Sequence, residues 1–170
     1  IAVDAAGNVY VTGRSFGNGT GTDFATIKYD ASGTQLWLQR YNGTNNDDDA
    51  PVSICVDAAG NVYSGGWASR TSTGIDYAIV KYSAAGSQVW VRNYSGTGSG
   101  NDFMNAMIID ASGNLYATGS SRGAANDDYA TVKYSSAGTL LWSARYEGSG
   151  VDEGTALTVD LQGNVVVTGS

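Results

Sequence analysis

The chain has 170 residues, 42% of them hydrophobic and 15% charged, which fits a globular protein and not a disordered one. Its net charge of −7 argues against a nucleic-acid partner, because a phosphate-binding face needs clustered Lys and Arg and the nine basic residues are scattered. There is no run of about 18 apolar residues, so we expect no membrane insertion, and without any histidine the single Cys55 is expected to be structural.

An eleven-residue motif opens the chain as VDAAGNVYVTG and returns three more times as VDAAGNVYSGG, IDASGNLYATG and VDLQGNVVVTG. Its aspartates, Asp4, Asp57, Asp110 and Asp160, are separated by 53, 53 and 50 residues. Regular self-similarity on this scale is typical of repeat architectures. A second motif, DFATIKYDASGTQLW in its first copy, follows the first with the same period, so each repeat has two halves.

Each half reads as two short β-prone runs joined by a Gly-containing turn, which predicts a hairpin. Two hairpins give four antiparallel strands per repeat, as in a β-propeller blade. The sequence therefore predicts an all-β protein with about three blades and the first hairpin of a fourth. The predicted blades cover residues 1–41, 50–94 and 103–146, and the last hairpin covers residues 153–170.

Both motifs together resemble the SBBP repeats of bacterial extracellular and cell-surface β-propellers, and the first motif is similar also to NHL propeller repeats. The resemblance implies an exported or cell-surface location. We expect no cofactor, apart from the calcium considered below. The second motif is similar to the tryptophan docking motif of quinoprotein propellers, although its turn is one residue shorter. That likeness implies that Trp37, Trp90 and Trp142 brace neighbouring blades.

Residues that recur in every repeat are interpreted as scaffold. We expect Lys28 to pair with Asp4, and Lys81 with Asp57, across two strand spacings. At the opposite end of each blade, one aspartate precedes the first strand and another begins the third, and both are expected to form Asx turns that bind backbone N–H groups. These are Asp49, Asp102 and Asp152, and Asp23, Asp76 and Asp128.

The longer loops differ between repeats, and all of them are predicted to lie on one face, where recognition is usually built. The candidate ligand-binding residues there are Trp67, Arg70, Arg14, Phe16 and Arg122. Trp67 and Arg70 are expected to form a recognition pair, with packing of Trp67 under its own loop as the alternative. The consecutive Asp47, Asp48 and Asp49 are a candidate calcium site, the alternative being a solvated loop.

The favoured function is a non-enzymatic scaffold with a surface for a protein or glycan ligand. The alternative is a propeller enzyme, a lyase or glycoside hydrolase that uses Asp, Arg and Tyr groups near the axis. Three blades and a hairpin are fewer than the four to eight of a closed ring. We therefore expect the ring to be completed by a homo-oligomer or by the rest of a longer chain.

Overall fold

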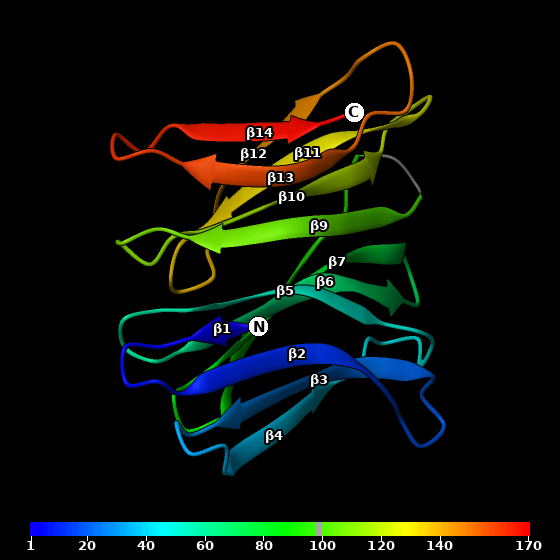
Figure 1. Ribbon diagram of the computed structural model, residues 1–170. Coiled ribbons are helices and arrows are strands. Elements are labelled where there is room, and N and C mark those ends of the chain that lie inside the picture. The colour runs from blue at the N-terminus through cyan, green and yellow to red at the C-terminus, as the bar shows by residue number, and fades with distance from the viewer. Residues whose placement is uncertain (98–99) are drawn as a thin grey trace.

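The computed structural model describes residues 1–97 and 100–170, and these form strands and turns without a helix. Accordingly, they include no helix of the length and hydrophobicity that crossing a membrane requires. The strands form three four-stranded antiparallel sheets and a two-stranded sheet, with neighbours in chain order (Figure 1). This arrangement confirms the predicted all-β fold of three four-stranded antiparallel sheets followed by a hairpin, and it is consistent with propeller blades.

We number the sheets as blades 1 to 3 and call the last two strands the terminal hairpin. Blade 1 consists of β1 (Ala2–Val3), β2 (Val9–Phe16), β3 (Thr22–Tyr29) and β4 (Gln35–Tyr41). Blade 2 consists of β5 (Ala50–Val56), β6 (Val62–Arg70), β7 (Gly74–Tyr82) and β8 (Gln88–Tyr94). Blade 3 consists of β9 (Asp102–Ile109), β10 (Leu115–Arg122), β11 (Asp127–Tyr134) and β12 (Leu140–Tyr146). The terminal hairpin consists of β13 (Gly154–Val159) and β14 (Val165–Gly169).

The repeated Asp-x-x-Gly-Asn segment builds the turn between the first two strands of each blade. In blade 1, Asp4 Oδ1 accepts the backbone N–H groups of Ala6 and Asn8 at 3.0 and 2.9 Å. Its other oxygen accepts the Asn8 amide and the Tyr10 hydroxyl, both at 2.8 Å. The hydrogen bond from the Asn8 side chain lowers the pKa of Asp4 to about 2. One aspartate thus fixes both the turn and the buried tyrosine of the following strand.

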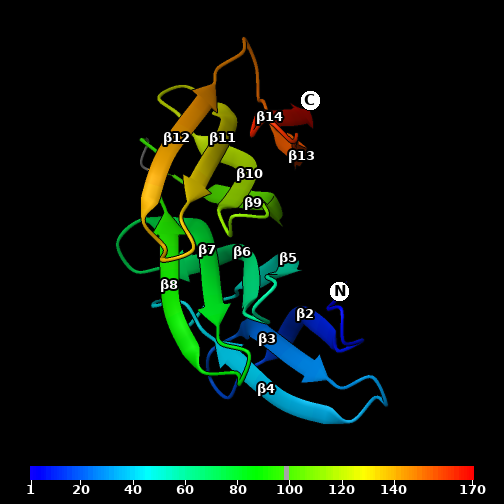
Figure 2. The same ribbon diagram turned by 90° about the vertical axis from the view of Figure 1, so that its left-hand side faces the viewer.

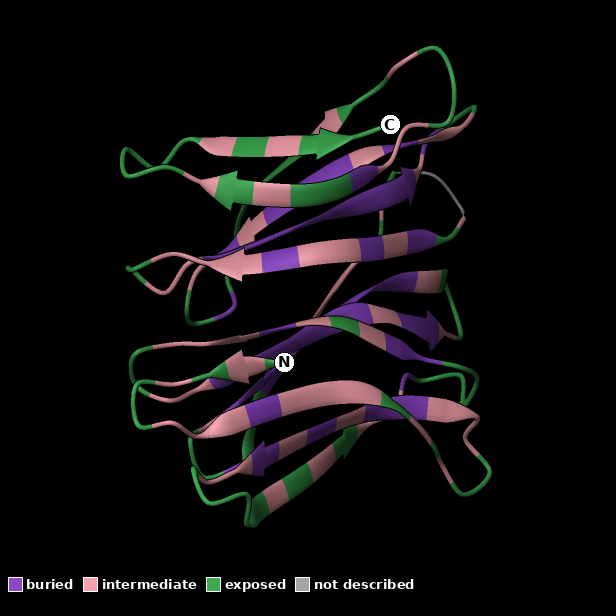
Figure 3. Cartoon of the chain, viewed as in Figure 1, coloured by how far each residue is buried: buried purple, intermediate pink, exposed green. Residues whose placement is uncertain are grey.

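The blades follow one another around an arc, and Figure 2 shows β5, β9 and β13 on its inner side with β4, β8 and β12 on its outer side. One hydrophobic cluster, which includes Tyr10, Phe24 and Tyr82, lies between blades 1 and 2. A second, which includes Tyr77 and Met104, lies between blades 2 and 3. Burial is greatest in the second and third strands of blades 2 and 3. In Figure 3 β10 is almost wholly buried, whereas β14 in the terminal hairpin carries no buried residue.

Cys55 lies in β5 at the second of these boundaries. Its thiol donates to the backbone carbonyl of Met107 in the next blade at 3.4 Å, and burial raises its pKa to about 11. A thiol with so high a pKa is almost entirely protonated at neutral pH, so it is a poor nucleophile. The contact agrees with the structural role expected for Cys55.

The turns between the third and fourth strands connect each blade to the preceding one. The backbone carbonyl of Ala84, in the β7–β8 turn, accepts the Trp37 indole N–H at 3.2 Å and the Lys28 ammonium at 3.4 Å. The carbonyl of Ser136 in the β11–β12 turn accepts the equivalent groups, Trp90 at 3.3 Å and Lys81 at 2.9 Å. Bracing by these two tryptophans, which we predicted, is therefore present.

The predicted lysine–aspartate ion pairs are wrong. The Lys28 and Lys81 ammonium groups lie over the rings of Tyr10 and Tyr63, 5.2 and 4.9 Å from the centroids, and reach forward to the next blade. The aspartates of their own blades are already bound by Asn and Tyr side chains at the first turn. Each lysine thus meets a carbonyl dipole and an aromatic face in place of the expected carboxylate.

Candidate functional site

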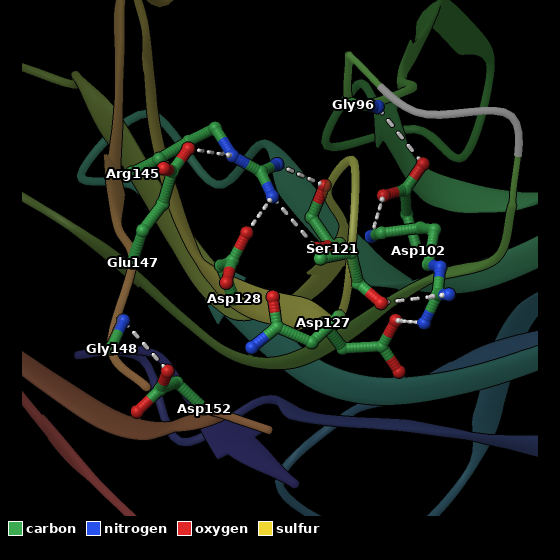
Figure 4. A network of polar contacts seen from close by, with 12 residues as sticks. Gly96, Asp102, Ser121, Asp127, Asp128, Arg145, Glu147, Gly148 and Asp152 are labelled. Atoms are coloured by element: carbon green, nitrogen blue, oxygen red, sulfur yellow. Dashed lines mark hydrogen bonds and ion pairs between the residues drawn. The ribbon is translucent and has the colours of Figure 1, made fainter. Parts of the chain in front are cut away.

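The candidate residues lie at the long-loop end of the blades, which is the end opposite the Asx turns. Its frame is set first by Asp49, whose two oxygens accept the backbone N–H groups of Gly43 and Ser69. Asp102 and Asp152 bind the preceding loop in the same way, each through a backbone N–H (Figure 4). Burial raises the pKa of Asp49 and of Asp102. These aspartates bind backbone N–H groups as predicted, but the N–H groups belong to the preceding loop and the second strand, so the predicted Asx turns are wrong.

The aspartates that begin the third strands do not form Asx turns and instead pair with arginines. Asp23 contacts Arg40 at 3.1 Å, and Asp128 contacts Arg145 at 2.8 Å. In Figure 4 the Arg145 guanidinium also donates to the hydroxyl and carbonyl oxygens of Ser121, at 2.6 and 2.9 Å. These carboxylates are nearly fully buried, so a cation is needed to offset the loss of hydration.

Blade 2 satisfies the same requirement from a different strand. Asn93 occupies the position of Arg40 and Arg145 in β8, and the cation beside Asp76 is Arg70, at 3.3 Å, from the end of β6. The Arg70 guanidinium also donates to the Asn93 side chain. The other blades have glycine at the position of Arg70, and there a Cβ would lie within 2.4 Å of the aspartate carboxylate. In blade 2 the arginine therefore comes from β6, and asparagine takes its usual position in β8.

Arg70 thus binds Asp76 and Asn93, and its predicted role with Trp67 in recognition stays a prediction. Trp67 pairs with another predicted candidate, because the Arg14 guanidinium carbon lies 5.0 Å from the centre of the indole ring. Phe103 of blade 3 meets the same indole edge-on, with centroids 5.5 Å apart. Arg14 and Trp67 occupy equivalent repeat positions in β2 and β6. Together with Phe103 they form a stack that runs from blade 1 through blade 2 to blade 3.

An open groove of about 370 Å³ lies beside the Trp67 ring at the boundary of blades 1 and 2. Asp48 is oriented by the backbone N–H and hydroxyl of Thr22, at 2.8 and 2.9 Å, and the backbone hydrogen bond lowers its pKa. Both Asp47 and Asp48 are exposed. The groove is lined by Gly21, Asp47, Asp48, Trp67, Ser69 and Ile75. It combines two anionic groups with an aromatic surface.

The three consecutive carboxylates do not converge. Asp47 accepts the Asn45 side-chain amide at 2.7 Å, Asp48 holds Thr22, and Asp49 is buried against backbone N–H groups. Across residues 1–97 and 100–170, no three or more His, Cys, Asp or Glu side chains gather where they could hold a metal ion. The calcium site stays a prediction, and the described residues contain no cluster of carboxylates that would support it.

The remaining candidates occupy one repeat position at the ends of β2 and β10. Phe16 is 85% exposed at the rim. Arg122 contacts Asp127 at 3.2 Å and donates to the carbonyl of Ala125 at 3.1 Å, so it stabilises its own loop. All five candidates belong to second strands and not to loops, because pairing with the third strand continues up to Phe16, Arg70 and Arg122.

The sequence reasoning missed Phe103, Arg40 and Arg145. A signal for the arginines exists, since each lies 17 residues after the aspartate that it contacts. Blade 2 has Asn93 at this spacing, so the pattern is not present in all three blades, and the cation beside Asp76 is Arg70 of β6. Phe103 has no such signal, since the position holds Ala50 in blade 2.

No protein-family model matches this chain, and neither does any curated protein sequence. The class of protein that the structure defines is therefore the architectural one: an all-β protein of repeated four-stranded antiparallel sheets, consistent with propeller blades.

Proposed function

We propose that this chain is a non-enzymatic β-propeller module of the SBBP repeat type, serving as a scaffold and as an interaction surface of an exported or cell-surface protein. Support comes from the use of its recurring polar side chains. The Asx-turn aspartates, the buried aspartates and the buried lysines all have partners within or between blades. Such residues contribute to architecture, and they leave recognition to side chains that break the repeat.

The observation that carries the proposal is the stack of Arg14 on Trp67 beside the carboxylates of Asp47 and Asp48. Blade 3 has Ser120 at the position of Arg14 and Trp67, so the stack occurs once among the three blades. A partly buried indole next to two exposed carboxylates suits a ligand with an apolar face and hydrogen-bond donors. A sugar ring and a basic or hydroxyl-rich peptide segment both fit this description.

The arc also needs partners at its two ends. The terminal hairpin supplies two strands of a fourth blade, and a closed propeller needs at least four complete blades. We propose that further blades, from a second copy or from more of the same polypeptide, complete the ring and cover the edges that would otherwise promote aggregation.

The test is a binding screen of neutral and acidic glycans and of basic peptides, using the whole chain and two variants. Trp67→Ala removes the aromatic surface, and we expect it to abolish binding of any ligand found, because aromatic anchors dominate small interfaces. Phe16→Ala is the matched control, since Phe16 lies at the same end but outside the groove, and binding should be unchanged. A ligand that binds Trp67→Ala as tightly as the original chain would contradict the assignment of the groove.

The same ligands separate a binding module from an enzyme. A bound glycan should be recovered intact after long incubation with the chain. Cleavage or elimination of the glycan that disappears in Asp47→Asn, Asp48→Asn or Asp49→Asn would replace the binding module with the alternative, a glycoside hydrolase or lyase.

A further inference from the structure

Blade 3 repeats the surface that blades 1 and 2 use to hold the next blade. In each of those blades, a lysine and a tryptophan share a single backbone carbonyl of the following β-turn. The indole lies directly on the turn glycine: a Cβ on Gly86 would be 2.8 Å from the Trp37 ring, and one on Gly138 would be 3.1 Å from the Trp90 ring. The interface therefore selects a turn with a free carbonyl and a glycine two residues later.

Lys133 and Trp142 present the same groups at the end of the arc. The Lys133 ammonium lies 4.9 Å from the centre of the Tyr116 ring, as Lys81 lies over Tyr63. Trp142 is 36% exposed, compared with 8% for Trp90, and Tyr146 is 62% exposed. Within the part of the chain that the structure describes, neither the Lys133 ammonium nor the Trp142 indole N–H has a hydrogen-bond acceptor.

The second half of this surface is the free edge of β14. In blade 2, β6 pairs with β7 so that Val62 faces Tyr82 and Gly66 faces Ala78. Val165 and Gly169 hold the positions of Val62 and Gly66 in β14, but β14 pairs with β13 alone. Unpaired backbone groups along such an edge are able to accept an added strand.

We propose that β14, Lys133 and Trp142 form a docking site for a β-hairpin of the same repeat type, supplied by another polypeptide segment. One strand of the hairpin pairs with β14, and its turn carbonyl accepts both side chains. The occupant follows from continuity with two interfaces already present in the fold, in which this kind of hairpin covers the equivalent surface. The inference deepens the proposed function, since it rests on the propeller-type stacking of blades and names the partner that continues it.

An intact second copy fits this site less well than a free hairpin. Its own hairpin β3–β4 is joined to β2 along the edge of β3, with Val9 opposite Tyr29 and Phe16 opposite Thr22. That strand would fall where β14 already lies. The proposal therefore commits to a hairpin segment whose third-strand edge is unpaired.

The test adds a synthetic peptide of residues 74–94, which has the sequence of the β7–β8 hairpin, to the ¹⁵N-labelled chain. The Trp142 indole N–H signal, identified by its loss in Trp142→Phe, should shift to lower field with a saturable dependence on peptide concentration. Backbone amides of residues 165–169 should become protected from hydrogen exchange. A peptide carrying Gly86→Val should not bind, because its side chain would meet the indole.

Trp142→Phe keeps the aromatic ring but loses the hydrogen bond, and we expect it to weaken peptide binding about tenfold. Trp37→Phe is the matched control, since its acceptor Ala84 is internal, and it should bind the peptide as the original chain does. The proposal is overturned if the folded chain leaves the Trp142 signal unmoved at millimolar peptide. It is equally overturned if the chain forms a dimer that buries Trp142 and that the peptide cannot displace.

These results are independent of the groove at Trp67. Loss of ligand binding in Trp67→Ala, together with an unmoved Trp142 signal, would overturn hairpin docking alone. A Trp142 response without any groove ligand would leave docking in place and contradict the recognition role of the groove.

Discussion

The two ends of each blade bind their recurring aspartates in different ways, through fixed side chains at the Asx-turn end and through arginines from different strands at the long-loop end. At the Asx-turn end, every blade uses the same residue types in the same places, and Asp4, Asp57 and Asp110 each bind the asparagine four residues later and the tyrosine six residues later. At the long-loop end, each aspartate that begins a third strand pairs with an arginine, but that arginine comes from the fourth strand in blades 1 and 3 and from the second strand in blade 2. The turn geometry requires particular residues at particular positions, whereas a buried carboxylate requires only that some nearby residue supplies a positive charge.

The largest effect is expected at the Asx-turn end, where Gly86→Ala changes the turn between β7 and β8. Gly86 has φ of +88° and lies against the Trp37 ring, so the substitution combines backbone strain with a steric clash. We expect a loss of about 3 kcal/mol in the free energy of unfolding, measured by urea denaturation.

Gly33→Ala is the matched control for that change. Gly33 has φ of +86° at the equivalent turn of blade 1, but nothing lies within 4 Å of its added Cβ. Backbone strain alone should cost about 1 kcal/mol. Equal losses at the two glycines would show that the contact between the turn and the preceding blade contributes little.

A smaller effect is expected at the long-loop end, where the arginine comes from different strands in different blades. Arg70→Gly restores the residue found in blades 1 and 3 but leaves the nearly fully buried carboxylate of Asp76 without its cation. We expect a loss of about 2 kcal/mol in the free energy of unfolding, less than for a fully buried pair because the Arg70 side chain is partly exposed.

Adding Asn93→Arg to Arg70→Gly recreates the arrangement of blades 1 and 3 and should recover most of that loss. The measurement is a double-mutant cycle by urea denaturation. If the two changes simply add, the charge would not be exchangeable between β6 and β8.

The smallest effect concerns pH at the Asx turns. The hydrogen bond from Asn8 lowers the pKa of Asp4 from 3.8 to about 2, so the folded state favours the carboxylate. The resulting stabilisation is present above pH 3.8 and is lost as the pH falls through about 2. The difference in denaturation midpoint between the original chain and Asp4→Asn should therefore shrink between pH 5 and pH 2. A difference that stays constant over this range would contradict the role of the charge.

The sequence was sufficient to predict the fold because the information was repeated. The turn glycines, the alternating strands and Trp37 and Trp90 appear with a constant period, so local signals reinforce one another. The partner of Lys81 could not be predicted in this way, because a carbonyl of the next blade has no signature in the sequence. The stack of Arg14 on Trp67 is equally hidden, since it depends on the rotation between two blades and not on spacing within one.

The carbonyl shared by a lysine and a tryptophan gives the array a direction. The lysine and tryptophan of blade 1 bind the turn of blade 2, and those of blade 2 bind the turn of blade 3, whereas among the residues that the structure describes no such pair binds a turn of the preceding blade. In a linear array whose stability is mostly nearest-neighbour coupling, loosening the β11–β12 turn would release Lys81 and Trp90 of blade 2, and loosening the β7–β8 turn would release Lys28 and Trp37 of blade 1. Each contact stabilises both of the blades that it joins, so a disturbance of one turn is expected to raise hydrogen exchange on both sides of that boundary, in the turn itself and around the lysine and tryptophan of the preceding blade.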